Sequence, residues 1–168
     1  MLNADALLAF VTLQRGGELA VARRNTRALR SQGAHEVGAE HYPFIVALHA
    51  SWLVTLWLLG RSRPLVPRFV ILYLILQAAR RWVLRTLGAR WTTRIIILPD
   101  VPPVTGGPYR FLKHPNYAIV ALELPCASLA VGLPWHALVF GSLNLALLAW
   151  RMQVENAAWQ DTSGNTHC

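Results

Sequence analysis

Long apolar runs alternate with short basic segments along this chain of 168 residues. A helix needs about 20 apolar residues to cross the hydrocarbon core of a bilayer, and ~17 is the lower limit. Five runs approach or exceed that limit, at residues 2 to about 21, 42–59, 65 to about 79, 117–133 and 134–150. The pattern therefore predicts an all-α integral membrane protein with about five transmembrane helices.

Polar residues interrupt some of these runs and mark the connections between them. Arg15 and Glu18 lie inside the first run, and Glu123 lies about two turns into the fourth. Only Gly132-Leu133-Pro134 separates the fourth run from the fifth, which leaves room for nothing but a tight turn. We therefore expect the last two helices to form a C-terminal helical hairpin of antiparallel neighbours.

The composition favours a membrane protein over a soluble helical domain. Hydrophobic residues make up 54% of the chain and charged residues only 14%, whereas about a quarter of a soluble domain is charged. The net charge of +8 is compatible with nucleic-acid binding, but the basic residues lie between the apolar runs and form no stripe with interleaved aromatics. We expect membrane lipid as a partner and no nucleic acid. Two cysteines indicate no disulfide framework, and we expect no metal site.

Arginine and lysine are distributed unevenly among the connections. Twelve lie in the segments that follow the first, third and fifth runs, and three lie after or just beyond the second. By the positive-inside rule, this asymmetry places the N-terminus outside and the C-terminus in the cytoplasm. We expect three regions: N-terminal membrane helices over 1–87, a cytoplasmic loop with the last two helices over 88–160, and a disordered tail over 161–168.

Residues 88–116 form the longest segment outside the apolar runs. Its stretch 95–98 is Ile-Ile-Ile-Leu, and three prolines follow it before a Gly-Gly-Pro turn. Periodicity does not decide whether 95–98 is a short strand, an interfacial stretch or packed coil.

The stretch 106–117, Gly-Gly-Pro-Tyr-Arg-Phe-Leu-Lys-His-Pro-Asn-Tyr, concentrates polar and basic residues directly before an apolar run. A helix is expected to begin at the His-Pro pair, because proline suits the first helical position. The positive end of the helix dipole, with Arg110 and His114 beside it, predicts a binding site for an anionic ligand. Tyr109 and Tyr117 are either membrane-interface anchors or aromatic faces for a cationic or purine-bearing ligand.

Arg151 and Glu155 stand four residues apart just after the fifth run, so they share one helix face. They form either an exposed ion pair of little energetic value or part of a site. The hairpin brings the start of the fourth helix and the end of the fifth to the same membrane face. This topology gathers the polar residues of both segments: Tyr109, Arg110, His114, Asn116, Arg151 and Glu155.

Glu123 is the most deeply placed acid in the predicted spans. A carboxylate at that depth is costly, which indicates either contact with a substrate or a partner within the bundle. Arg15 and Glu18 can pair with each other or with Glu123. Structural pairing ranks slightly above a substrate role for these residues.

Four short motifs in this order resemble the isoprenylcysteine carboxyl methyltransferase family. They are Arg-Trp-Thr-Thr-Arg at 90–94, Gly-Pro-Tyr-Arg at 107–110, His-Pro-Asn-Tyr at 114–117 and Arg-x-x-x-Glu at 151–155. With Glu-His-Tyr-Pro at 40–43, the third motif looks like the bacterial branch of alkylpyrone and alkylresorcinol O-methyltransferases. The resemblance covers roughly residues 10–158. One departure is Glu155-Asn156, where many family members carry two consecutive acidic residues.

The resemblance implies S-adenosylmethionine as the cofactor, bound by the 107–117 loop and the end of the last helix at the cytoplasmic face of a bacterial inner membrane. The implied cofactor contacts are Tyr109, Arg110, His114, Pro115, Asn116 and Tyr117. Glu155 is the expected base that removes the acceptor's proton, and Arg151 is expected to orient Glu155 or to stabilise the oxyanion. Glu123 is the candidate contact to a lipophilic substrate.

The implied reaction is methylation of a hydroxyl group on a lipid-tailed polyketide. Two alternatives within the same class stay open, which are methylation of a prenylated cysteine carboxylate and methylation of a phospholipid amine. A non-enzymic membrane protein that binds lipid is the alternative of another class. The sequence leaves the exact acceptor and the oligomeric state undetermined.

Overall fold

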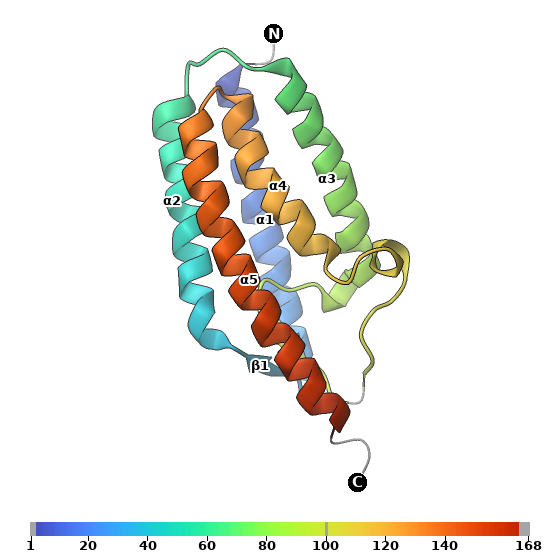
Figure 1. Ribbon diagram of the computed structural model, residues 1–168. Coiled ribbons are helices and arrows are strands. Elements are labelled where there is room, and N and C mark those ends of the chain that lie inside the picture. The colour runs from blue at the N-terminus through green and yellow to red at the C-terminus, as the bar shows by residue number, and fades with distance from the viewer. Residues whose placement is uncertain (1–2, 100, 165–168) are drawn as a thin grey trace.

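The computed structural model describes residues 3–99 and 101–164, with side chains up to residue 158. Five helices run side by side in one bundle (Figure 1). They are α1 (Ala4–Arg30), α2 (Tyr42–Gly60), α3 (Pro67–Leu87), α4 (Pro115–Ala130) and α5 (Pro134–Gly164). The five helices predicted from the apolar runs are confirmed. However, α1, α3 and α5 extend well past the predicted C-terminal limits.

Local sequence signals explain where several helices begin and turn. The Asn3 side chain caps α1 by accepting a hydrogen bond from Ala6 N–H over 2.9 Å. Proline stands at the start of α4, as predicted from the His-Pro pair. Between α4 and α5, Gly132 adopts a φ of 69°, a conformation that glycine reaches without steric cost. Leu133 N–H then bonds to Ser128 O over 3.0 Å, which closes the predicted hairpin.

A small two-stranded sheet joins segments that lie far apart in the sequence. Strand β1 (His35–Val37) pairs antiparallel with β2 (Ile95–Ile97), with Glu36 opposite Ile96. Of the three possibilities for 95–98, the short strand is therefore correct. The carboxylate of Glu36 also pairs with Arg94 and with Arg30 at the end of α1. The sheet and these ion pairs fasten the long loop to the connection between α1 and α2.

Three single-turn 3-10 helices complete the described structure. They are η1 (Ala39–His41) before α2, η2 (Gly88–Arg90) after α3 and η3 (Gly107–Arg110) before α4. Helix α5 continues to Gly164, so it includes the first residues of the segment expected to be a disordered tail. Residues 165–168 of that segment lie outside the described residues.

Large apolar side chains are exposed on the outer faces of all five helices, including Leu13, Leu58, Ile75, Leu122 and Trp135. Soluble monomers rarely expose apolar surface so extensively. Two helical segments, Ala39–Gly60 and Pro134–Ala158, are long and apolar enough to cross a membrane. Membrane crossing by α1, α3 and α4 stays a prediction.

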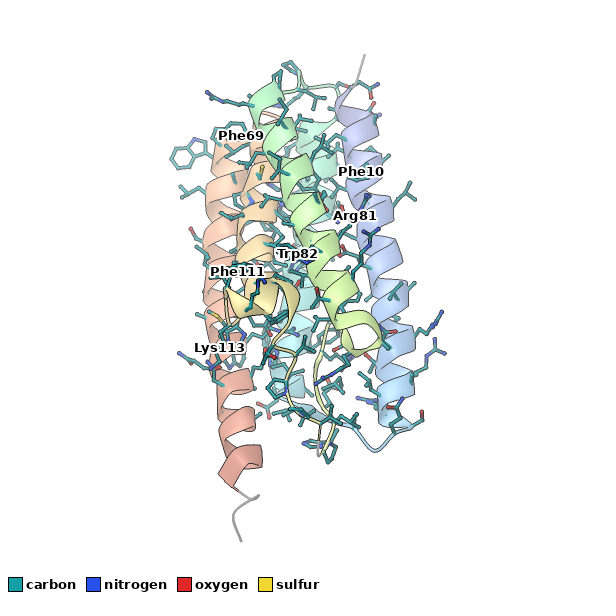
Figure 2. All side chains as sticks on the ribbon, turned by 90° about the vertical axis from the view of Figure 1, so that its right-hand side faces the viewer. Phe10, Phe69, Arg81, Trp82, Phe111 and Lys113 are labelled. Atoms are coloured by element: carbon teal, nitrogen blue, oxygen red, sulfur yellow. The ribbon has the colours of Figure 1, made fainter. Side chains whose placement is uncertain are left out.

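Basic and aromatic residues surround the lower half of α3. Arg81 and Trp82 lie on the exposed face of this helix, and the exposed Phe111 and Lys113 follow η3 (Figure 2). Such a mixture is typical of the level where a membrane meets water. Arg80, by contrast, is 5% exposed and is not a loop charge as the sequence suggested, because α3 continues past it and directs it into the bundle.

The connections divide between the two ends of the bundle. The α1–α2 connection, the long loop after α3 and the end of α5 lie at one end, opposite the α2–α3 turn and the α4–α5 hairpin (Figure 1). The arginines of the last turns of α1 and α3 and those of the long loop therefore gather at the end that the positive-inside rule assigns to the cytoplasm. Which side of the membrane this end faces stays a prediction.

Candidate active site

A glycine allows the turn before α4 to pack closely against α3. Gly107 has a φ of 58°, and a Cβ at this position would lie 2.6 Å from Thr86 Oγ1 on α3. No side chain fits there without a shift of the backbone or of Thr86. The turn therefore lies directly against α3, and η3 places Tyr109 at the edge of a cavity.

The His-Pro pair reduces the number of N–H groups that the described structure leaves without a backbone acceptor at the start of α4. Tyr117 N–H and Ala118 N–H both donate to His114 O, at 3.1 and 3.2 Å, and Pro115 has no N–H. Among the described residues, the N–H of Asn116 has no backbone acceptor. The anion-binding site expected at this helix terminus therefore consists of one backbone N–H group and the basic side chains around it.

The Tyr117 side chain connects α4 to α5. Arg151 Nε donates to the Tyr117 hydroxyl oxygen over 2.8 Å, and the hydroxyl donates to Glu155 Oε2. The imidazole of His114 stacks on the Tyr117 ring, with centroids 5.3 Å apart and an interplanar angle of 14°. Arg151 and Glu155 do share one helix face, but Tyr117 bridges them, and they form no exposed ion pair of their own within the described residues.

A cavity of about 410 Å³ lies between the long loop and the ends of α4 and α5, and we call it the loop cavity. Its basic lining residues are Arg90, Arg94, Lys113 and Arg151. Six residues singled out from the sequence line it together: Tyr109, His114, Asn116, Tyr117, Arg151 and Glu155. Their convergence follows the predicted topology, and their roles stay predictions.

Three other predicted residues lie outside the loop cavity. Arg110 is exposed, and its guanidinium lies 4.4 Å from the centre of the Phe111 ring. Pro115 is buried at the start of α4, where it shapes the helix terminus. Glu123 lies farther along α4 and lines neither this cavity nor the one described next.

A second cavity, of about 400 Å³, lies inside the helix bundle, and we call it the bundle cavity. Its apolar lining comes mainly from α1, α2 and α5, with Leu19, Ile45, Leu53 and Leu148 among the lining residues. Five residues line both cavities and form the boundary between them: Trp91, Thr92, Asn116, Tyr117 and Arg151.

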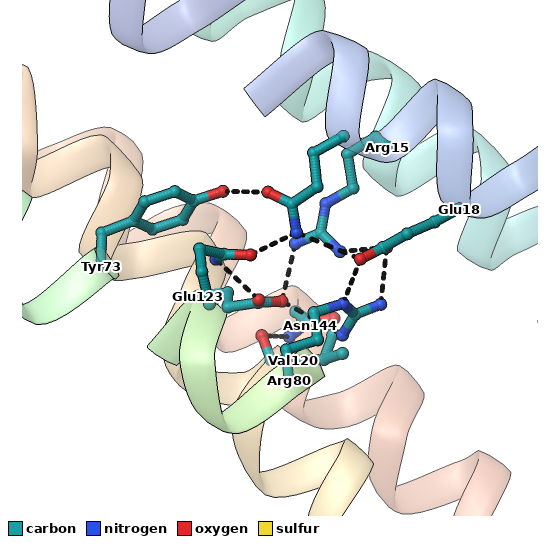
Figure 3. Close-up of polar contacts among 9 residues, drawn as sticks. Arg15, Glu18, Tyr73, Arg80, Val120, Glu123 and Asn144 are labelled. Atoms are coloured by element: carbon teal, nitrogen blue, oxygen red, sulfur yellow. Dashed lines mark hydrogen bonds and ion pairs between the residues drawn. The ribbon is translucent and has the colours of Figure 1, made fainter. Parts of the chain in front are cut away.

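Buried charges adjoin the bundle cavity. Glu123 is fully buried and accepts hydrogen bonds from Arg15 Nη2 at 2.8 Å, Gln77 Nε2 at 2.9 Å and Arg80 Nη1 at 3.2 Å (Figure 3). Arg15 also pairs with Glu18 at 3.2 Å, and Arg80 pairs with Glu18 at 2.6 Å. Both pairings considered for Arg15 from the sequence are therefore present. The contacts of Glu123 are those of a structural partner, and its role toward a substrate stays a prediction.

Helices α3, α4 and α5, together with the long loop between α3 and α4, match a known family. The model of the isoprenylcysteine carboxyl methyltransferase family matches residues 69–161, which is more than half of the chain. The chain belongs to this family. It is 39% identical over 166 residues to an uncharacterized protein of Bacillus subtilis (strain 168), YpbQ, and this similarity covers 94% of the chain and 96% of YpbQ. No solved structure gives a significant match.

A more distant relative covers the same extent. It is an uncharacterized protein of Haemophilus influenzae (strain ATCC 51907 / DSM 11121 / KW20 / Rd), 25% identical over 164 residues, with 94% of this chain and 95% of the relative covered. Family membership suggests a methyltransferase that uses S-adenosylmethionine. Neither the family match nor these relatives identify the methyl acceptor.

The residues of the loop cavity fit the cofactor that the isoprenylcysteine carboxyl methyltransferase family implies. Trp91 Nε1 and Asn116 Oδ1 are buried and have no hydrogen-bond partner within the described residues. Buried polar atoms of this kind are rare unless a ligand or water satisfies them. Burial, reinforced by the nearby Glu155 carboxylate, raises the pKa of Tyr109 to about 12, so this phenol stays neutral at physiological pH.

Several residues of the two cavities carry little signal in the sequence. Trp91 stands in the Arg-Trp-Thr-Thr-Arg motif, and that placement was the one signal that could have singled it out. Asn25 supports it by donating to Trp91 O over 2.8 Å. His49, which lines the bundle cavity, gave no signal, because it is one polar ring within an apolar run. Tyr42, which lines the same cavity, stands in the motif at 40–43, but no contact to a ligand was assigned to it.

Proposed function

We propose that the protein is a membrane-embedded, S-adenosylmethionine-dependent O-methyltransferase that methylates a hydroxyl group of a lipid-tailed polyketide, such as an alkylpyrone or an alkylresorcinol. One observation carries the proposal. A basic cavity at the loop end of the bundle and a largely apolar cavity inside the bundle share a boundary formed by Asn116, Tyr117 and Arg151. This arrangement suits a water-soluble donor on one side and a lipid-tailed acceptor on the other.

The loop cavity offers groups for each part of the cofactor. When bound, S-adenosylmethionine supplies a methyl group that is already activated by its sulfonium. Lys113 and the free N–H of Asn116 suit the cofactor's carboxylate. The rings of Tyr109 and Trp91 suit an adenine or a positively charged sulfur, since aromatic faces attract both.

The bundle cavity offers a place for the acceptor. Apolar side chains from α1, α2 and α5 surround an alkyl chain, and the polar head then lies at the boundary beside Tyr117 and Arg151. The protein aligns the acceptor oxygen with the methyl group, and such alignment supplies much of the rate gain in a two-substrate transfer. Glu155 is the proposed final proton acceptor, and the guanidinium of Arg151 stabilises negative charge on oxygen.

A competition assay tests the acceptor class. Purified protein is supplied with methyl-labelled S-adenosylmethionine and equal amounts of an alkylpyrone, an alkylresorcinol, a prenylated cysteine and a phosphatidylethanolamine. We expect label in one or both polyketide lipids. Label in the prenylated cysteine or in the phospholipid would instead support one of the two alternatives within the methyltransferase class.

Binding of the product S-adenosylhomocysteine, measured by calorimetry, separates an enzyme from a non-enzymic lipid-binding protein. We expect heat of binding with wild-type protein and strongly weakened turnover in His114→Ala and Glu155→Ala. Asp5→Ala serves as a control, because Asp5 is exposed at the start of α1 and lines neither cavity. The absence of both binding and turnover in wild-type protein would contradict the proposed activity.

A further inference from the structure

The hydroxyl of Tyr117 lies between an arginine and a carboxylate at the boundary of the two cavities. It accepts from Arg151 Nε over 2.8 Å and donates to Glu155 Oε2. Tyr117 is only 8% exposed and lines both cavities, whereas Glu155 lines the loop cavity and is not among the lining residues of the bundle cavity. An acceptor in the bundle cavity therefore has Tyr117, and not Glu155, as its neighbour.

The directions of these hydrogen bonds are determined by the chemistry of the groups. A guanidinium has donors only, so the Tyr117 oxygen must accept from Arg151. The phenolic proton is then directed to the Glu155 carboxylate, which accepts it. The phenolic oxygen retains one acceptor lone pair, and a hydroxyl group at the boundary can donate to it.

Building on the proposed O-methyltransferase activity, we propose that Tyr117 relays a proton from the acceptor hydroxyl to Glu155. The acceptor's O–H proton passes to the Tyr117 oxygen while the original phenolic proton passes to Glu155. The acceptor oxygen forms a bond to the methyl carbon, the carbon–sulfur bond breaks, and its electron pair stays on sulfur. Glu155 is half-buried at the loop cavity, where it returns the proton to water.

The relay matters only for an acceptor that arrives protonated. A phenol such as an alkylresorcinol has an ordinary pKa near 10, so it needs a base at neutral pH. A hydroxypyrone is a vinylogous acid and is already ionised. Loss of the relay must therefore slow methylation of the phenol far more than methylation of the pyrone.

The variant Tyr117→Phe removes the hydroxyl and keeps the ring that stacks on His114. With the alkylresorcinol, kcat should fall by about 100-fold or more, the usual range for loss of general base catalysis. With the alkylpyrone, the fall should be at least about tenfold smaller. Glu155→Gln should show the same selectivity, because its amide cannot take up the proton. Tyr73→Phe is the matched control, since Tyr73 bonds to Gln14 and lines neither cavity.

A second measurement requires no turnover. An alkylated nitrophenol absorbs visible light when ionised, so its titration can be followed while it is bound to cofactor-free protein. In Tyr117→Phe the apparent pKa of the bound probe should rise by about one unit or more, because the phenolate oxygen can no longer accept a hydrogen bond from the Tyr117 hydroxyl, which carries the relayed proton. Retained binding of S-adenosylhomocysteine, within about threefold of wild type, shows that the variant is folded.

Two results would overturn the relay: equal losses of kcat on both acceptors, or an unchanged titration of the bound nitrophenol. The failure of the proposed function has a different signature, because wild-type protein would then methylate neither acceptor. In that case the nitrophenol titration alone decides whether Tyr117 contacts a phenol at the boundary.

Discussion

Glu123→Ala removes the carboxylate that contacts the buried Arg80 and the half-buried Arg15 inside the bundle. In the native protein Arg15 and Arg80 share Glu18 and Glu123, so these four side chains are neutral together. Without Glu123 the cluster carries one excess positive charge. The hydrogen bonds at 2.8, 2.9 and 3.2 Å are lost at the same time.

The expected loss of unfolding free energy is about 3–5 kcal/mol, the range for breaking a buried ion pair by removing one partner. A loss of 3 kcal/mol already shifts the unfolding equilibrium about a hundredfold. Glu123→Gln should cost less, because the amide oxygen still accepts a hydrogen bond, but the excess positive charge remains. Unfolding of the purified protein in mixed micelles, followed by circular dichroism at increasing denaturant, measures these differences.

Leu122→Ala provides a control at the adjacent position. Leu122 is 57% exposed on the outer face of α4, so its truncation leaves the core unchanged, and we expect a change within about 0.5 kcal/mol. If Glu123→Ala unfolded at the same denaturant concentration as Leu122→Ala, the buried cluster would not stabilise the bundle.

Three further predictions concern the loop, the membrane orientation and the support of Trp91. Gly107→Ala should weaken S-adenosylhomocysteine binding in calorimetry and destabilise the protein by about 1–3 kcal/mol. The reason is that residue 107 has a φ of 58° and that the new Cβ meets Thr86 on α3. Unchanged affinity would contradict this prediction. In intact cells, a membrane-impermeant thiol reagent should label Ser62→Cys in the α2–α3 turn but not Ser31→Cys after α1. The reverse labelling would mean that the membrane orientation is opposite to the predicted one. Asn25→Ala should cost about 1–3 kcal/mol in denaturant unfolding, because Trp91 O and Gly88 O lose a buried donor; wild-type stability would refute this.

Short-range signals predicted the parts of the site that depend on chain geometry. The His-Pro pair predicted where α4 begins, since proline at the first helical position follows from its missing N–H. The three-residue connection before α5 predicted the hairpin, because no other path fits so few residues. Together these two features brought His114 and Glu155 to one cavity without any knowledge of long-range contacts.

Long-range pairings could not be predicted in the same way. The partner of β2 lies about 60 residues earlier, and three isoleucines carry no information about which strand they meet. The spacing of Arg151 and Glu155 predicted a shared helix face, but not that Tyr117 on α4 would bridge them. Arg80 looked like a topological signal because its ion-pair partners, Glu18 and Glu123, come from other helices.

The division of the two cavities along the chain has a consequence for selectivity. Before residue 69, where the family match begins, the chain contributes only Leu29 to the described lining of the loop cavity, but more than half of the lining of the bundle cavity. Under the proposed function, substitutions at residues of α1 and α2 that line the bundle cavity are therefore expected to change the choice of acceptor and to leave S-adenosylhomocysteine binding unchanged.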